Sequence, residues 1–150
     1  MGMRPWAWDS QGNKIRCAQT GITIIEEGVF IGSNVTIVRG AFENKPTVIG
    51  KHTMVAHGTM IGHGSIIGAH NHFANNVAIA GSVESGSCCF FGSGATVRPH
   101  ITFQNDVIVG AGAVVVKDFA ESGLTLIGNP AKKLIKEKET RSGVPSPFSA

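Results

Sequence analysis

The chain has 150 residues, the length of one domain with a hydrophobic core of its own. Hydrophobic residues make up 42% of it and charged residues 15%, which excludes a disordered or fibrous protein. The formal net charge is only +3, with the Lys and Arg mostly late in the chain, which argues against a basic nucleic-acid-binding face.

Membrane and secreted proteins are also not expected. No apolar run reaches the roughly 18 residues of a membrane span, and no signal peptide opens the chain. Three cysteines, two of them adjacent at Cys88 and Cys89, make neither a disulfide framework nor a CxxC pair, so we expect reduced thiols with a packing role. The sequence therefore predicts a cytoplasmic protein with no membrane span and no nucleic-acid partner.

Residues 1–21 come first and carry both tryptophans. They lie outside the regular pattern that begins directly after them. Because an array of strands with an open end needs a cover, we predict that this segment is an N-terminal cap.

Residues 22–118 repeat with a period of six. In steps of six from Ile25 to Val115, fourteen of sixteen positions are large and apolar, the exceptions being Glu43 and Ser85. A second series, two positions earlier, is mostly small or β-branched, and glycine or alanine follows many of the apolar positions. A helix, with 3.6 residues per turn, cannot keep such a repeat on one face, whereas a strand can because six is a multiple of two. Each repeat is therefore predicted to be a short strand followed by a corner.

Three such strands close a triangular coil, so residues three repeats apart are predicted to stack at roughly the 4.8 Å spacing of neighbouring strands. Positions 25–115 give about five coils. The predicted fold is therefore all-β, a solenoid of hexapeptide coils.

The six histidines all fall outside the two inward series and should face outward. His63 and Gly81 are separated by one predicted coil and should stack on one face in successive coils. Such a pair suits acyl transfer, because an imidazole can take a proton from an attacking hydroxyl or amine and a glycine N–H can bind the oxyanion without crowding the reacting carbon. The alternative is that His63 is only a solvated corner residue.

The period ends at residue 118. Residues 119–139 are predicted to form a short extended piece, a turn at residues 128–130 and a short helix that begins at Ala131. Residues 140–150 have the composition of a frayed, flexible tail.

The motif of an aliphatic residue, then Gly, with a small residue four positions further on, resembles the hexapeptide-repeat acyltransferases over about residues 22–136. The resemblance implies a left-handed parallel β-helix and a homotrimer with active sites between its subunits. The stretch from His63 to Ser82, "HGSIIGAHNHFANNVAIAGS", is similar to the branch that contains nucleotide-amino-sugar N-acetyltransferases, sialic acid O-acetyltransferases and lipid A acyltransferases.

The resemblance to this branch implies roles for three residues. His63 would be the general base, Gly81 would offer its N–H to the acyl carbonyl, and His72 would lie beside the acyl-CoA or the substrate. Relatives often carry Glu or Asp directly after the catalytic histidine, where it orients the ring, whereas this chain has Gly64. A backbone carbonyl, a neighbouring subunit or nothing would then orient His63.

Two late segments, "VGAGAVVVKD" at 109–118 and "IGNPAKKL" at 127–134, resemble the coenzyme A end of the hexapeptide acetyltransferases. The resemblance implies backbone amides that bind the pantetheine arm, a turn that packs against the adenine end, and lysines that meet the phosphates. The amides are those of Gly110, Ala111 and Gly112, the turn consists of Asn129, Pro130 and Ala131, and the lysines are Lys117, Lys132 and Lys133. Relatives that use acyl carrier protein tend to end in a longer helical domain, which favours acetyl-CoA here. The alternative is a solvated C-terminal segment with a capping turn.

Metal-dependent chemistry is a second hypothesis. His52 and His57 have the HxxxxH spacing of two zinc ligands in the gamma-class carbonic anhydrases, which share the implied fold, but that family takes a third histidine from upstream and no histidine precedes His52. His52, His70 and Cys88 follow one another at the spacing of one predicted coil and form a predicted column for zinc or nickel. A catalytically silent trimeric scaffold is the third hypothesis.

The sequence thus predicts an acetyl-CoA-dependent O- or N-acetyltransferase with a sugar or nucleotide-sugar acceptor of the cell envelope. Direct attack on the thioester is expected, because neither Cys88 nor a serine is near His63 in the predicted stacking. The nucleotide-sugar enzymes that it resembles carry an N-terminal nucleotide-binding domain, which is not recognised in this chain. A smaller acceptor, residues 1–21 or another protein would replace that domain.

Overall fold

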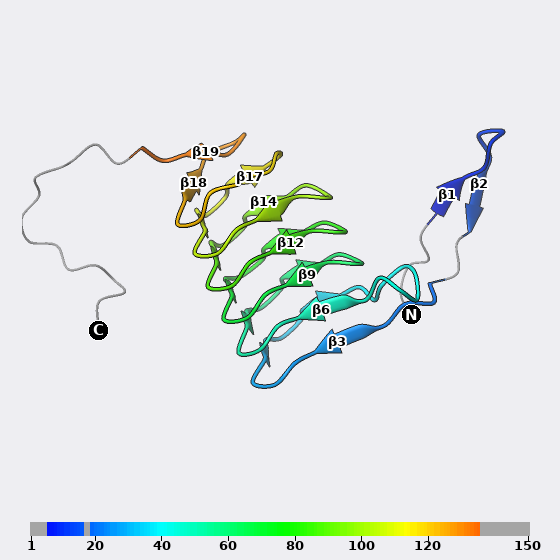
Figure 1. The fold of residues 1–150 in the computed structure, drawn as a ribbon, viewed down its shortest axis with the longest axis horizontal. Coiled ribbons are helices and arrows are strands. Elements are labelled where there is room, and N and C mark those ends of the chain that lie inside the picture. Colours follow the sequence, from blue (N-terminus) through cyan, green and yellow to red (C-terminus); the bar gives the residue numbers. More distant parts are fainter. Residues whose placement is uncertain (1–5, 17–18, 136–150) are drawn as a thin grey trace, which may run out of the picture.

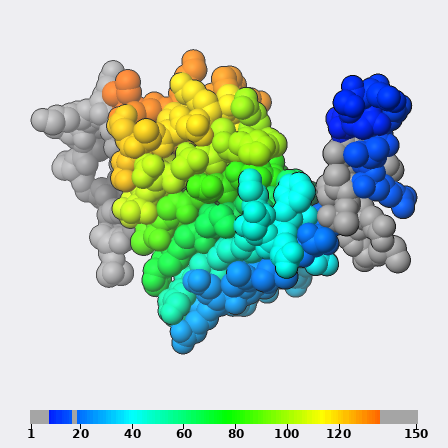
Figure 2. Space-filling model, turned by 45° about the vertical axis from the view of Figure 1, so that its right-hand side comes forward, coloured from blue at the N-terminus to red at the C-terminus, as the bar shows by residue number. Residues whose placement is uncertain are grey.

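The structure is a computed structural model that describes residues 6–16 and 19–135. The chain winds as a parallel β-solenoid whose short strands form three walls (Figure 1). Its coils follow one another in sequence order along the axis (Figure 2). The described residues contain no helix, and hence none long and apolar enough to cross a membrane. The predicted all-β parallel β-helix is confirmed, with a stacking of coils consistent with a left-handed winding.

Each wall is one sheet of stacked strands. The first wall consists of β3 (Thr23–Ile25), β6 (Thr47–Ile49), β9 (Ile66–Ile67), β12 (Glu84–Ser85) and β15 (Thr102–Phe103). The second wall consists of β4 (Phe30–Ile31), β7 (Met54–Val55), β10 (His72–Phe73), β13 (Phe90–Phe91), β16 (Ile108–Val109), β18 (Thr125–Ile127) and β19 (Lys132–Lys133). The third wall consists of β5 (Thr36–Ile37), β8 (Met60–Ile61), β11 (Ala78–Ile79), β14 (Thr96–Val97) and β17 (Val114–Val115). Neighbouring strands pair in parallel, except for β18 and β19.

The core is built from the apolar position of each repeat, as predicted. Ile49, Ile61, Phe73 and Phe91 are fully buried between the walls. The rings of Phe73 and Phe91 stack in consecutive coils with their centroids 4.5 Å apart. Because each coil covers the apolar side chains of the next, every added coil stabilises the stack by about 25 cal/mol per Å² of apolar surface removed from water.

The second inward series places polar groups inside the solenoid, and these groups are hydrogen-bonded. Thr53 donates from Oγ1 to the Gly68 carbonyl at 3.0 Å, and Thr59 donates to the Ala74 carbonyl at 2.9 Å. No buried side-chain nitrogen or oxygen in the described part of the chain lacks a partner. Because their hydroxyls are hydrogen-bonded, burial of the inward threonines does not cost the free energy of an unsatisfied polar group.

The first coil is longer than predicted. Ile25 pairs with Ile49, four repeats further along the chain, whereas Ile49 pairs with Ile67, three repeats further along. The additional residues lie in a loop between β5 and β6, the insertion loop (residues 39–46), where Glu43 is exposed. The predicted stacking of residues three repeats apart is therefore wrong for the first coil, and Glu43 is not an inward position.

Hydrogen bonds hold both ends of the insertion loop at one corner. The N–H groups of Gly40 and Thr47 both donate to the Ile22 carbonyl, at 3.1 and 3.0 Å. Arg39 donates from Nε to the Gly21 carbonyl at 2.7 Å. The chain therefore leaves and rejoins the coil at the same place, and the register of the later coils is unchanged.

Apart from the corner that carries the insertion loop and the corner after β17, each corner places a residue at positive φ, three positions after the inward apolar residue. Asn, Asp and His tolerate this left-handed region better than most non-glycine residues do. The left-handed backbone at these corners is therefore one reason why histidine occurs at three of them. The non-glycine residues at these positions, with φ from 55° to 61°, are Asn34, His52, His70, Asn76, Ser82, Cys88, His100 and Asp106.

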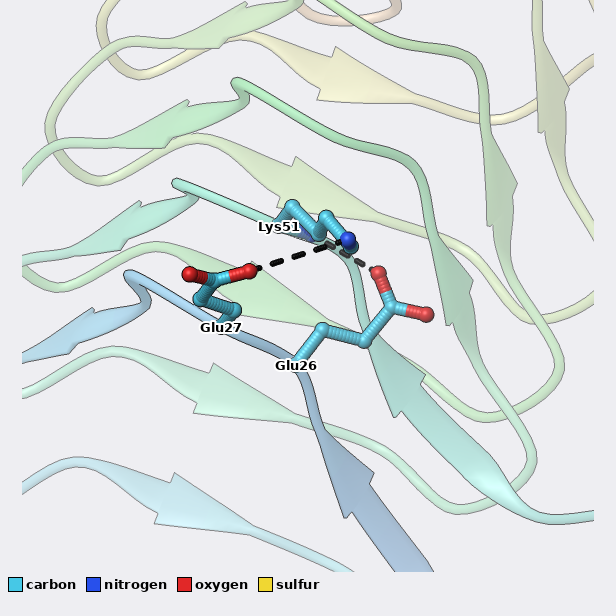
Figure 3. A network of polar contacts seen from close by, with 3 residues as sticks. All are labelled: Glu26, Glu27 and Lys51. Carbon is cyan, nitrogen blue, oxygen red and sulfur yellow. Dashed lines mark hydrogen bonds and ion pairs between the residues drawn. The ribbon is translucent and has the colours of Figure 1, made fainter.

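Polar contacts link the first two coils at the corner between the first and second walls (Figure 3). Lys51 Nζ lies 3.7 Å from Glu27 Oε2, and the Lys51 backbone N–H donates to Glu26 Oε2 at 3.0 Å. The ion pair is exposed to solvent, so we expect it to contribute at most about 1 kcal/mol.

The described part of the N-terminal segment is an antiparallel hairpin of β1 (Trp6–Trp8) and β2 (Lys14–Arg16) (Figure 1). Ile25 and Ile31 belong to the inward series of the first coil but remain 49% and 40% exposed. That residues 1–21 cap this end stays a prediction.

The C-terminal end of the solenoid is closed by strands. The predicted helix start at Ala131 is wrong, because Lys132–Lys133 forms β19 against β18. Ala131 donates its N–H to the Val114 carbonyl at 2.8 Å, so this backbone is bonded to the last coil and not to a helical turn. Residues 136–150, with the rest of the predicted helix and the predicted tail, lie outside the described residues.

Candidate active site

His63 and Gly81 meet at the corner between the third and first walls, called here the His63 corner (residues 62–64 and 80–82). His63 follows β8, and Gly81 follows β11 in the next coil. A Cβ built on Gly81 would lie 2.7 Å from His63 Nε2 and 2.8 Å from Cε1, so the imidazole lies against the Gly81 Cα. The predicted stacking of these two residues is therefore present.

The Gly81 N–H is unused in the described residues. At the same position of another corner, Ser87 donates its N–H to Asn105 Oδ1 of the next coil at 2.8 Å. Pro99 occupies that place above Gly81, and its side chain has no acceptor. An N–H beside the His63 ring thus remains available to a ligand oxygen.

Packing alone orients the His63 ring within the described part of the chain. The ring is half-buried and takes part in no hydrogen bond there. Gly64, at φ +65°, offers no carboxylate, and its N–H donates to Thr47 Oγ1 at 2.8 Å. Because this chain has Gly64 where relatives often carry Glu or Asp, the imidazole is held by its contact with Gly81.

His72 lies far from this corner in the same chain. It stands on the outer face of β10 in the second wall, paired with Met54 and Phe90. Its ring contacts the Phe90 ring edge-on, with centroids 5.2 Å apart. The second wall is opposite the corner between the third and first walls, so one chain does not bring His72 to His63.

His57 has a structural role. Its Nδ1 accepts a hydrogen bond from the Ser33 N–H of the preceding coil at 2.9 Å. The ring nitrogen that faces the solenoid is therefore engaged in joining two coils.

The alternative metal column is present only as a stack of side chains. The rings of His52 and His70 stack with centroids 5.2 Å apart and 26° between their planes. No group of three or more His, Cys, Asp or Glu side chains in the described residues is arranged to hold a metal ion. The structure thus gives no support to a site formed by His52, His70 and Cys88.

Cys89 packs in the core next to the exposed Cys88. Burial raises the pKa of the Cys89 thiol above its ordinary value of 9.0. Its Sγ lies 3.2 Å from the Gln104 carbonyl, to which it donates. Cys89 is therefore a protonated residue with the predicted packing role, whereas Cys88 is exposed and the packing role predicted for it is wrong.

Fewer backbone amides are free to bind coenzyme A than predicted, partly because strand β18 pairs with β16. The Gly110 N–H donates to the Leu126 carbonyl at 2.8 Å, and the Gly112 N–H donates to the Ser93 carbonyl at 2.9 Å. Two of the three amides expected to bind pantetheine are thus used inside the chain. The Ala111 N–H is unused in the described residues and remains a candidate.

The predicted turn lies over the last coil beside a cavity. Val114 donates its N–H to the Gly128 carbonyl at 3.0 Å, which fixes the turn above β17. The cavity has a volume of about 520 Å³, and Asn129, Pro130 and Lys132 are among the residues that line it. These three predicted cofactor residues therefore lie together at one open surface.

The other two predicted lysines have partners of their own. Lys133 also lines the cavity, but its Nζ is paired with Glu121. Lys117 Nζ lies 5.6 Å from the centre of the Phe119 ring. Lys132 is therefore the strongest candidate for a phosphate contact at this cavity.

A second cavity, of about 380 Å³, lies beside the His63 corner and was missed in the sequence. It lies along the outer face of the first wall, beside the insertion loop. The only sequence signal for it is Glu43, which interrupts the apolar series. We call this cavity the Glu84 groove; the residues used to define it are Lys45, Pro46, Ile66, Ser82, Glu84 and His100.

Comparison with known proteins finds acyltransferases. The chain is 38% identical over 112 residues to UDP-3-O-acylglucosamine N-acyltransferase from Herminiimonas arsenicoxydans. The match covers 75% of this chain and 31% of that protein, so the chain spans about a third of the length of this relative. No family model matches the chain.

Solved structures share the fold. LpxA from Acinetobacter baumannii has a TM-score of 0.72 at 28% identity, over 78% of this chain and 45% of that one. A perosamine N-acetyltransferase variant from Caulobacter crescentus, in complex with CoA and GDP-perosamine, has a TM-score of 0.61 at 31% identity, over 76% of this chain and 54% of that one. These similarities confirm the resemblance to the hexapeptide-repeat acyltransferases.

Proposed function

We propose that this chain, which resembles the hexapeptide-repeat acyltransferases throughout its solenoid, is a cytoplasmic acetyl-CoA-dependent O- or N-acetyltransferase with a sugar or nucleotide-sugar acceptor. The observation that carries this proposal is the His63 ring against the Gly81 Cα, beside an N–H that no described residue uses. The named activities of the relative and of the solved perosamine N-acetyltransferase support acyl transfer to a sugar derivative.

In the proposed mechanism, the acceptor hydroxyl or amine attacks the thioester carbonyl carbon while His63 takes its proton. The carbonyl π electrons move onto oxygen, and the Gly81 N–H donates to this oxyanion. The tetrahedral intermediate then collapses, the C–S bond breaks, and the leaving thiolate takes the proton from the His63 imidazolium. A general base contributes about 10²–10⁴-fold and one oxyanion donor about 10²–10³-fold to such a rate.

Direct transfer is favoured over a covalent cysteine intermediate. Cys88 lies at the corner between the first and second walls, and His63 lies at the corner between the third and first walls. The expectation that no serine is near His63 is wrong, because Ser82 follows Gly81 at the His63 corner and donates its N–H to the His63 carbonyl at 2.8 Å. Within the described residues, however, its hydroxyl makes no hydrogen bond to the His63 ring. His63 is therefore placed to activate an acceptor and not a cysteine.

The active form proposed here is a homotrimer with sites between subunits. The second wall supports this, because its outward residues Phe30, Met54 and Ile108 are 54%, 46% and 37% exposed in a single chain. A neighbour whose His63 corner faced this wall would bring His72 of one subunit near His63 of the next. Such an arrangement gives His72 the position beside the substrate that one chain cannot provide.

The proposed donor is acetyl-CoA. The solved perosamine N-acetyltransferase complex contains CoA, and the Ala111 N–H and the cavity at Asn129, Pro130 and Lys132 lie together at the C-terminal end of this solenoid. An exposed ammonium such as that of Lys132 suits a phosphate as a mobile point charge.

A thiol-release assay with acetyl-CoA and a panel of amino sugars and sugar alcohols tests the function. We expect turnover with at least one acceptor and a loss of about 10²–10⁴-fold in kcat for His63→Ala. The matched control is His52→Ala, which removes an exposed corner histidine away from the site. Equal turnover of His63→Ala and the unchanged protein would reject His63 as the base, and tight CoA binding without turnover on any acceptor would favour a silent scaffold.

A further inference from the structure

The Glu84 groove contains charged and polar side chains that do not satisfy one another. Glu84 projects from β12, Lys45 belongs to the insertion loop, and His100 stands at a positive-φ corner. Within the described residues, no hydrogen bond or ion pair engages the side chains of these three residues. A carboxylate, an ammonium and an imidazole are therefore all available to a ligand in one groove.

The groove also has an apolar surface. Ile66, on the outer face of β9, is 38% exposed, and Pro46 closes the loop side. An aliphatic surface beside several hydrogen-bonding groups matches a pyranose ring, which has C–H faces and a rim of hydroxyls. The volume of about 380 Å³ is toward the lower end of the roughly 300–1,000 Å³ range of small-molecule sites, which suits one sugar ring better than a whole nucleotide sugar.

The backbone joins the groove to the His63 corner. Ser82 lines the groove and donates its N–H to the His63 carbonyl at 2.8 Å. His100 lines the groove and donates its N–H to the Gly81 carbonyl at 3.1 Å. A ring bound here would therefore be positioned by the same backbone that places the imidazole and the unused amide.

The insertion loop sets this groove apart from the other corners between the third and first walls of this chain. Lys45 and Pro46 exist only because the first coil is one repeat longer than the coils that follow, and hydrogen bonds to Ile22 hold the loop at its base. The other corners between the third and first walls have no such loop in the described residues. The loop is thus an addition, held at its base, directly beside the proposed catalytic corner.

We propose that the Glu84 groove is the acceptor subsite and that it binds the pyranose ring of an amino sugar or related hexose. Glu84 accepts hydrogen bonds from ring hydroxyls, Lys45 and His100 contact further oxygens, and Ile66 packs under the ring. This inference rests on the proposed acetyltransferase function for the identity of the bound ring as the acceptor.

Binding and turnover are tested separately on the full chain. Saturation-transfer NMR with glucosamine, N-acetylglucosamine and galactose measures binding without any donor. We expect Glu84→Gln and Lys45→Ala to weaken binding of the preferred sugar by about tenfold or more, since each removes a charge-assisted hydrogen bond. Glu43→Gln is the matched control, because Glu43 is an exposed carboxylate of the same loop outside the groove lining.

In the thiol-release assay, the same two groove variants should raise the acceptor KM about tenfold while the acetyl-CoA KM stays unchanged. Circular dichroism melting shows whether each variant is folded. The proposal that the Glu84 groove binds the acceptor would be overturned if no sugar in the panel binds. Unchanged binding and an unchanged acceptor KM in both variants would also overturn it. Sugar binding that depends on Glu84 in a protein without transferase activity would support the groove and reject the proposed function.

Discussion

The imidazole of His63 lies against the Cα of Gly81, and the missing side chain at Gly81 makes this contact possible. A Cβ there would come within 2.7 Å of His63 Nε2, well inside the optimal separation of about 3.5–4.0 Å for non-bonded carbon atoms. The glycine therefore provides both the space for the base and, next to it, an N–H without a partner in the described part of the chain.

Gly81→Ala should displace the His63 ring while the chain stays folded. The added methyl occupies the place of the imidazole, and a misplacement of about 1 Å at a reacting group can cost on the order of 10²-fold in rate. We expect kcat to fall by about this factor, with a smaller change in the KM for acetyl-CoA. Steady-state kinetics with both substrates measure the effect.

The double variant His63→Ala, Gly81→Ala tests whether the two residues act together. If the methyl acts by displacing the imidazole, its effect should vanish once the imidazole is gone, so the double variant should be no slower than His63→Ala. Independent, multiplying effects of the two substitutions would contradict the contact as the cause.

Cys89 should make stability depend on alkaline pH. Burial raises the pKa of its thiol, so the folded state holds the proton more tightly than the unfolded state. The resulting stability is fully present below the unfolded pKa, near 9.0, and is lost as pH rises through the higher folded value. Urea unfolding of the unchanged protein and of Cys89→Ala, near neutral pH and well above pH 9.0, measures this difference.

The advantage of the unchanged protein over Cys89→Ala should shrink at the alkaline pH, because only the unchanged protein has a thiol to ionise at this position. Comparison with the variant cancels the titration of the lysines and of the other cysteines. A difference in unfolding free energy that is the same at both pH values would contradict the assigned direction of the pKa shift.

Asn71 should be the polar residue whose loss destabilises the core most. It is 1% exposed, and its Nδ2 donates to the Gly68 and Gly86 carbonyls and to Ser85 Oγ at 3.0, 2.9 and 3.0 Å. Its Oδ1 accepts the Cys89 N–H at 2.6 Å. Asn71→Ala leaves buried groups without partners, so we expect a loss of roughly 3 kcal/mol in the free energy of unfolding.

Asn75→Ala is the matched control, because Asn75 is exposed at the corner that follows β10. Its removal should change the free energy of unfolding by less than about 0.5 kcal/mol. Denaturant unfolding of both variants gives the comparison, and equal losses for Asn71 and Asn75 would show that the buried hydrogen bonds do not stabilise this coil.

Much of the fold could be predicted because the inward positions follow from strand alternation alone. The stacking of His63 on Gly81 also followed, since both lie in coils of three repeats. The insertion loop could not be separated from a repeat, because an insertion as long as one repeat preserves the period. The engaged amides of Gly110 and Gly112 depend on how β18 adds to β16, with Val109 opposite Leu126, and that pairing leaves no trace in the pattern.

The position of His72 shows a different limit of the sequence. Its place in β10 follows from the repeat, and its outward direction is confirmed by its half-buried position on the second wall. Whether it meets His63 depends on a neighbouring subunit, because the two residues lie on opposite sides of one coil. A single-chain repeat pattern carries no information on that contact.

Deletion of residues 41–46 should restore a first coil of three repeats. Gly40 and Thr47 already donate to the same Ile22 carbonyl, so their backbones lie close enough to be joined with little rearrangement. Gly40 can adopt the positive φ that a tight corner requires. Because the closure entropy of a loop changes by only about 0.6 kcal/mol for each doubling of its length, we expect the shortened chain to fold with similar stability.

The shortened chain should lose affinity for the acceptor but not for acetyl-CoA. The deletion removes Lys45 and Pro46 from the Glu84 groove and leaves Ala111 and the cavity at Pro130 in place. Acceptor KM, acetyl-CoA KM and the melting temperature of the deletion variant are compared with those of the unchanged protein. A rise in both KM values together would mean that the loop supports the whole solenoid, whereas an unchanged acceptor KM would mean that the acceptor binds away from the loop.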